Sequence, residues 1–311
     1  MGHHELQVWL GFTALVVALL VLDLGVLNRR SHALSLKEAG AWSGGLIGLA
    51  LAFGLFVWWQ EGAHHALEYY AGYLIELSLS VDNLFVFLLI FTYFGVRSEA
   101  QPKVLKWGIL GAIVMRLVMI ALGALLLNRF TWIVYVFGGL LVLTGIRMFT
   151  QKDAAVDLER NPVARLARRI FPFSHTYDGT KFFTRTVQGR RLATPLLLVL
   201  LVVEWSDLVF AIDSIPAIFA VTRDPFLVYS SNVFAILGLR ALFFVLAGML
   251  DRFVYLKTGV AFILVFVGLK MLVSAWFHLP VLISLAVIVM TLAVSVILSL
   301  RHGAREPRLA S

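Results

Sequence analysis

The chain has 311 residues, of which 60% are hydrophobic and 14% are charged, and it contains no cysteine. Soluble domains average about 45–50% apolar and about 25% charged residues, so this composition excludes a cytosolic enzyme and places most of the chain in a lipid bilayer. The lack of cysteine excludes disulfides, thiolate metal sites, iron–sulfur clusters and thiol redox chemistry.

Nine segments are apolar for long enough to cross a hydrocarbon core of about 30 Å, which takes roughly 20 helical residues. They cover approximately 7–28, 38–60, 68–94, 104–128, 131–150, 193–221, 226–250, 254–275 and 279–300. The short alternating segments of a membrane β-barrel do not occur in the sequence. The sequence therefore predicts an all-α polytopic membrane protein, with residues 1–311 forming a single membrane domain.

One long connection, 151–192, separates the fifth and sixth segments. Its stretch from Pro162 to Phe171 is basic and would be amphipathic as a helix, which predicts contact with anionic lipid. The alternative is the ordinary charge of a cytoplasmic loop. Further along, 182–187 and 190–194 flank Gln188-Gly189, which is the pattern of a short hairpin.

Lys and Arg residues are distributed unequally between the two sides that nine spans define. The side that holds the N-terminus carries only Arg129 and Arg223, whereas nearly all the others lie on the opposite side. The positive-inside rule makes the basic side cytoplasmic. The N-terminus is therefore predicted outside and the C-terminus in the cytoplasm. Topology explains the formal net charge of +8, so nucleic-acid binding is not needed.

Two parts of the chain carry the same kinds of polar residue in the same order. The first copy has Glu76, Asp82, Asn83 and Arg116, and the second has Asp207, Asp213, Ser214 and Arg240. Each copy contains an odd number of spans, so the second must enter the membrane upside down. This predicts an inverted repeat, a common architecture of secondary transporters. The first repeat covers 68–150 and the second 193–275, and the last helix, 279–300, follows them.

Carboxylates inside a membrane span cost about 2.5–3.5 kcal/mol each on insertion scales and mark ion or proton pathways. The predicted metal ligands are hard oxygen donors near the midplane. They are Glu76, Asp82, Asn83, Glu204, Asp207, Asp213 and Ser214, with Arg116, Arg240 and Asp23 as charge partners. All eight histidines lie in predicted loops or tails. This ligand set favours Mg²⁺, Ca²⁺ or Mn²⁺ over zinc or copper.

The acids cannot all ionise together in a dry site, so a divalent cation and protons are expected to compete for them. The sequence therefore predicts cation/H⁺ exchange by a protein that is no enzyme and has no resident cofactor. Static ion pairs between helices are the alternative interpretation, but the acids outnumber the two arginines. No G-x-x-x-x-G-K-[ST] motif occurs, which argues against ATP drive by this chain.

The stretches Gly72–Phe87, Val203–Thr222 and Asn232–Arg240 resemble the signature of the TerC family, in its Alx-like branch, and the likeness covers roughly residues 8–300. The resemblance implies an inner-membrane protein linked to Mn²⁺ export and to tellurium resistance, in which the matching acids handle the metal. Only the resemblance points to manganese, and the ligand chemistry leaves Ca²⁺ or another divalent cation open. A second alternative is a non-transporting scaffold of a metal- or tellurium-stress or secretion complex, with the basic loop as its docking surface.

Overall fold

The computed structural model describes residues 6–22, 36–130, 132–150, 162–174, 176–185, 190–247, 255–274, 276 and 279–303. Within these ranges, a few side chains lie outside the described part, and among them are those of Asp82, Asp213 and Arg240. Asp23 lies outside the described residues altogether. The described chain is almost entirely helical, in agreement with the predicted all-α membrane protein.

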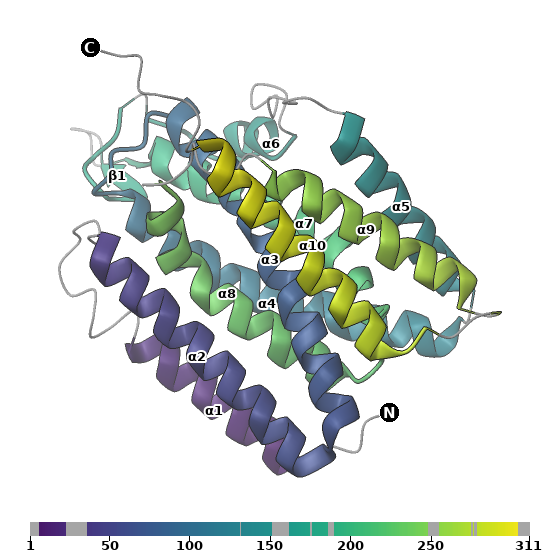
Figure 1. Cartoon of the computed structure of the whole chain (residues 1–311). Coiled ribbons are helices and arrows are strands. Elements are labelled where there is room, and N and C mark those ends of the chain that lie inside the picture. The colour runs from purple at the N-terminus through teal and green to yellow at the C-terminus, as the bar shows by residue number, and fades with distance from the viewer. Residues whose placement is uncertain are drawn as a thin grey trace.

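Each of the predicted apolar segments coincides with one long helix, and these helices lie side by side in a bundle (Figure 1). The long helices are α1 (Leu6–Val21), α2 (Leu36–Glu61), α3 (Ala63–Tyr93), α4 (Gln101–Arg129), α5 (Ile133–Thr150), α7 (Pro195–Phe219), α8 (Pro225–Ala247), α9 (Leu256–Val273) and α10 (Val281–Gly303). Within the described ranges, α2, α4, α7 and α10 are long and apolar enough to cross a membrane, and α1, α5, α8 and α9 contain shorter apolar stretches. These helices support an integral membrane protein, while the number of crossings stays a prediction.

Local chemistry explains where several helices begin and end. The carboxylate of Asp224 accepts a hydrogen bond from the Phe226 N–H at 2.8 Å, so it caps α8, and Pro225 occupies the first helical position. Gly62 alone separates α2 from α3, and its φ of 89° lies in the left-handed region that glycine adopts without strain. Pro216 lies inside α7, where it cannot donate the usual backbone hydrogen bond, and the helix ends at Phe219.

Small residues let neighbouring helices approach closely. Gly138 of α5 faces Gly268 of α9, while Gly145, further along α5, faces Ala261, which comes earlier in α9. These two helices therefore run antiparallel, with backbone against backbone. On α4, Gly111 faces Glu204 and Gly123 faces Phe219 of α7, so α4 and α7 run parallel.

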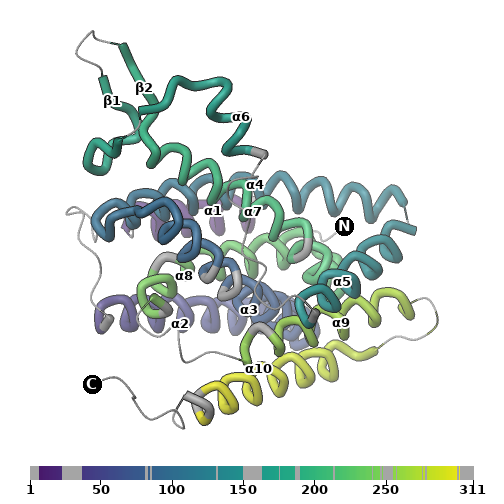
Figure 2. Tube along the Cα trace, turned by 90° about the horizontal axis from the view of Figure 1, so that it is seen from above, coloured from purple at the N-terminus to yellow at the C-terminus, as the bar shows by residue number. Residues whose placement is uncertain are grey.

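The described part of the long connection forms a small module beside the bundle, which Figure 2 shows at one side of the long helices. It contains α6 (Pro162–Ile170) and the strands β1 (Phe183–Arg185) and β2 (Arg191–Ala193). The strands pair antiparallel, with Phe183 opposite Ala193, as the hairpin pattern predicts. The Tyr177 hydroxyl donates to the Phe94 carbonyl at 2.6 Å, and the Lys103 ammonium donates to the Thr180 carbonyl at 2.6 Å. These two bonds hold the module against the end of α3 and the start of α4.

Candidate functional site

A buried arginine joins three helices in the interior of the bundle. Arg116 of α4 donates through Nη1 to Glu76 Oε1 of α3 and, at 3.1 Å, to Ser214 Oγ of α7. Its Nη2 lies 3.2 Å from Asp207 Oδ1, and its Nε lies 3.5 Å from Asp207 Oδ2. The guanidinium therefore binds Asp207 through two nitrogens and Glu76 through one. Planar, two-pronged binding of this kind is what arginine provides and lysine does not.

Among the described side chains, the charges of this cluster do not balance. Arg116 and Glu76 are 0% exposed and Asp207 is 2% exposed, so bulk solvent does not screen their charges. Two carboxylates face one guanidinium, which leaves an excess of one negative charge when all three groups are ionised. Among the described residues, the second carboxylate oxygen of Glu76, Oε2, is buried without a hydrogen-bond partner. A buried acceptor without a donor costs about 1–3 kcal/mol, and more when it is charged, so this oxygen is suited to receive a cation or a proton.

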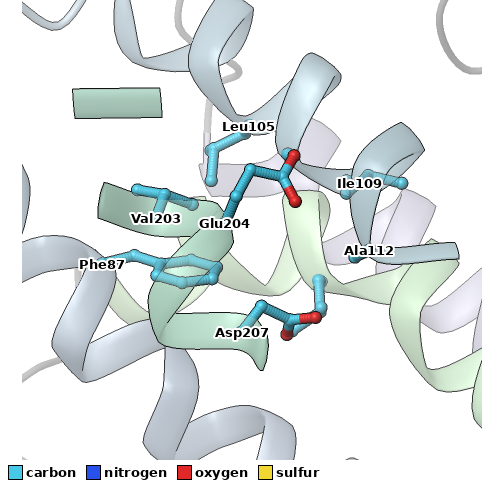
Figure 3. A pocket seen from close by; sticks show the side chains of 9 residues that line it. Phe87, Leu105, Ile109, Ala112, Val203, Glu204 and Asp207 are labelled. Carbon is cyan, nitrogen blue, oxygen red and sulfur yellow. The ribbon is translucent and has the colours of Figure 1, made fainter. Parts of the chain in front are cut away.

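Glu204 lies one helical turn before Asp207 on the same face of α7. Figure 3 shows both carboxylates at a narrow pocket between α7 and α4, with Phe87 of α3 alongside. The pocket is lined by Phe87, Leu105, Gly108, Ile109, Ala112, Val203, Glu204, Asp207 and Leu239. Gly111 makes room for Glu204, because a Cβ at that position would overlap its carboxyl group. Among the described residues, no hydrogen bond or ion pair reaches Glu204, so its carboxyl group differs from the two that Arg116 holds.

The structure places only part of the predicted ligand set. Asn83 is buried on α3 at 3% exposure. Asp82 and Asp213 lie on α3 and α7 by their backbones, but their side chains are outside the described part, as is that of Arg240. Among the described side chains, no group of three or more His, Asp or Glu residues could hold a metal ion. A single site with all the predicted ligands therefore stays a prediction.

Two further buried polar residues were missed from the sequence. The Oγ of Ser80 and both side-chain polar atoms of Asn232 are buried and have no hydrogen-bond partner within the described ranges. Ser80 follows Glu76 by four residues, so helical spacing puts the two on one face of α3. Asn232 carries an amide within an apolar span. Polar side chains inside membrane spans are costly and mark functional sites, so the sequence could have indicated Asn232 on the same ground as the acids.

Comparison with known proteins identifies relatives along almost the whole chain. Residues 61–306 match the model of the family described as "Integral membrane protein TerC family". An uncharacterized membrane protein of Myxococcus xanthus, STKORF319, is 50% identical over 299 residues, which cover 96% of this chain and 93% of the relative. Alx of Escherichia coli K12, which bears the provisional description of membrane-bound redox modulator, is 46% identical over 307 residues, covering 94% and 95%. No solved structure matches the chain.

Proposed function

The chain belongs to the TerC family of integral membrane proteins, and from its buried charges we propose that it is a secondary transporter that exports Mn²⁺ in exchange for H⁺. The protein is neither an enzyme nor dependent on a resident cofactor in this proposal. Manganese is the substrate, and the carboxylates of α3 and α7 are the groups that handle it.

The observation that carries the proposal is the cluster around Arg116. Glu76 and Asp207 are buried and share one guanidinium, and no side chain in the described part of the protein bonds to Glu76 Oε2. Glu204 adds a third carboxylate one turn away, at a pocket between two helices. Ion pairs that served only to hold the helices together would balance their charges, because uncompensated buried charge is destabilising. A site that alternately holds a cation and protons needs this excess of negative oxygen.

The arrangement of the helices supports the inverted repeat on which the mechanism depends. In the repeat, α3, α4 and α5 correspond to α7, α8 and α9. The packing of the helices agrees with this correspondence. The contact of α3 with α8 is equivalent to the contact of α7 with α4, and α5 packs on its own counterpart, α9. The antiparallel course of α5 and α9 is what a two-fold axis in the membrane plane requires. Such repeats let one half of a transporter move against the other and so expose the site to each side in turn.

The orientation follows from the positions of Lys and Arg. We place the protein in the cytoplasmic membrane with its N-terminus outside and with α6, the hairpin and the C-terminus in the cytoplasm. Exporting a divalent cation against an inside-negative potential costs about 4.6 kcal/mol per 100 mV, from ~2.3 kcal/mol per charge. Two incoming protons per ion would offset that charge.

The name of the Escherichia coli relative describes a redox modulator. This chain contains no cysteine, so thiol chemistry could not carry such a role here. Export of Mn²⁺ would be compatible with a redox-modulating role, because manganese is a redox-active metal. The carboxylates of the site are oxygen ligands of the kind that manganese prefers.

The test is metal flux in vesicles that contain only the purified chain. Mn²⁺ movement in such vesicles, driven by an imposed pH gradient with the voltage clamped at zero, is the expected result. Ca²⁺ is then added in excess as a competitor. If it abolishes Mn²⁺ flux, the transporter accepts divalent cations more broadly. Vesicles without any metal flux would indicate a scaffold, and flux that ignores the pH gradient would remove proton coupling.

Matched carboxylate variants locate the pathway. Glu204→Gln keeps the size of the side chain but removes its charge, so Mn²⁺ flux should fall at least ten-fold while the membrane abundance stays normal. Glu99→Gln makes the same change at an exposed position between α3 and α4 and should leave flux unchanged. Asp82→Asn and Asp213→Asn should behave like the Glu204 variant. Equal flux in Glu204→Gln and Glu99→Gln would remove Glu204 from the pathway.

A further inference from the structure

Helix α6 has three different faces although it is only nine residues long. Ala164 and Ala167 are buried where α6 packs on α7. Leu166 and Ile170 lie on the next face and are exposed by 56% and 61%. At roughly 100° per residue, Arg165 and Arg169 follow on the side opposite the alanines. The helix therefore presents an apolar row to its surroundings, although its contact with the bundle is already made by the alanines.

The apolar row continues beyond the helix. Phe171 comes directly after α6 and is 42% exposed, and Phe183 on β1 is 53% exposed. Phe171 and Phe183 line the same hollow, together with Lys181 and Arg185. We call the apolar residues Leu166, Ile170, Phe171 and Phe183, together with Arg165, Arg168 and Arg169, the α6 surface.

Within the described residues, the arginines of the α6 surface are not compensated by acidic side chains. Arg165, Arg168 and Arg169 are exposed, and no acidic side chain among the described residues forms an ion pair with them. A positive, partly apolar surface with exposed guanidinium groups is complementary to a negatively charged partner that also has an apolar interior.

We propose that the α6 surface lies in the headgroup region of the anionic leaflet that surrounds the bundle. Leu166 and Ile170 enter the boundary of the acyl chains, and the arginines bind lipid phosphates at the headgroup level. Figure 2 shows α6 next to α7 at one side of the bundle. The N-terminal end of α7 carries Pro195 and continues into the apolar span, so α6 packs next to a membrane-spanning segment.

Charge complementarity favours lipid over a second copy of the chain. A second copy would bring the same three arginines against the first, and the like charges would repel each other. An anionic leaflet is negative everywhere, and each Lys or Arg near it gains about 1 kcal/mol. Each arginine should therefore raise the ratio of docked to undocked α6 about five-fold, and all three together roughly 100-fold.

The lack of cysteine makes the test direct, because a single introduced cysteine is the only site that a thiol-reactive probe can label. The full chain carrying Leu166→Cys or Ile170→Cys is labelled with an environment-sensitive fluorophore. It is then placed in vesicles of zwitterionic lipid with or without about one-third phosphatidylglycerol. Ser98→Cys, in the exposed turn between α3 and α4, is the aqueous control, and Val118→Cys, exposed by 53% on α4, is the lipid-facing control.

With anionic lipid, the probes at Leu166 and Ile170 should emit at short wavelength and be quenched by lipids with a nitroxide near the headgroup. Their quenching should lie well above that at Ser98, with Val118 responding to nitroxides deeper in the bilayer. Replacing Arg165, Arg168 and Arg169 with Gln should return the emission to that of Ser98. Emission like that of Ser98 in both lipid mixtures would overturn the proposal. A short-wavelength emission that nitroxide lipids do not quench would also overturn it and would indicate a protein contact.

Discussion

Removal of the Arg116 guanidinium tests whether the buried cluster is organised as described. Arg116→Gln takes away the only cation that the described structure places against Glu76 and Asp207. Breaking a buried charge pair by removing one partner typically costs about 3–5 kcal/mol, because the remaining charge is left uncompensated. Here one substitution exposes two carboxylates to this penalty. The lower limit alone is a large part of a total stability of about 5–15 kcal/mol.

The effect can be measured as thermal unfolding of the purified chain in lipid nanodiscs. One kcal/mol shifts Tm by roughly 2–4 °C in soluble domains of 150–250 residues, so a loss of roughly 10 °C is expected. Arg129→Gln is the matched control, because it makes the same change at an exposed position in the last turn of α4. Its Tm should stay within about 2 °C of the unmodified chain, since surface substitutions rarely change stability by more than about 0.5 kcal/mol.

Neutralising Asp207 shows whether the loss of stability in Arg116→Gln comes from uncompensated charge or from lost packing. If uncompensated charge causes the loss, adding Asp207→Asn to Arg116→Gln should recover part of the Tm, and the coupling should lie in the range of about 0.5–3 kcal/mol seen for residues in contact. Strict additivity of the two changes would refute the pairing of Arg116 with Asp207. An Arg116→Gln variant as stable as Arg129→Gln would refute the buried network as a whole.

Three further predictions concern other parts of the molecule. Gly111→Ala should lower metal flux several-fold with little change in stability, because the new methyl group displaces only the flexible end of Glu204. Gly268→Ala should destabilise the protein by about 1–3 kcal/mol, because its Cβ would meet the backbone of α5 and force the helices apart. Hydrogen bonds from Thr184 and Lys181 hold the pKa of Asp178 below its usual value. These bonds therefore stabilise the hairpin above about pH 4 and are lost as the pH falls through the lower, folded-state pKa.

Each of these predictions has a direct measurement. Gly139→Ala on α5 is the control for both glycine variants, because a Cβ there would meet no atom within 4 Å, and it should change neither flux nor Tm. Unchanged flux in Gly111→Ala would separate Glu204 from transport, and unchanged Tm in Gly268→Ala would contradict the close α5–α9 contact. A ¹³C NMR titration of the full chain follows the Asp178 carboxyl carbon, and Thr184→Val should raise its pKa toward the ordinary value. Equal pKa values in the two proteins would rule out the hydrogen bond.

Much of the architecture could be predicted from the amino-acid sequence. The length of an apolar segment indicates a membrane helix directly, because the thickness of the bilayer sets the number of helical residues needed to cross it. The long helices therefore lie at the predicted segments, and α2 and α3 meet at Gly62, between two of them. The amphipathic α6 and the β1–β2 pairing were also predicted correctly, because a helical stripe and a glycine turn are signals within a few residues of sequence.

The partners of each buried charge depended on tertiary structure alone. A helix that is apolar all round carries little information about which face meets protein and which meets lipid. The sequence could therefore select Glu76, Asp207 and Arg116 as buried charges but not pair them. Arg116 lies 40 residues from Glu76 and 91 from Asp207, and packing of α4 against α3 and α7 brings the three together. The same packing leaves Glu204, only three residues from Asp207, beyond the reach of that guanidinium and beside the space that Gly111 provides.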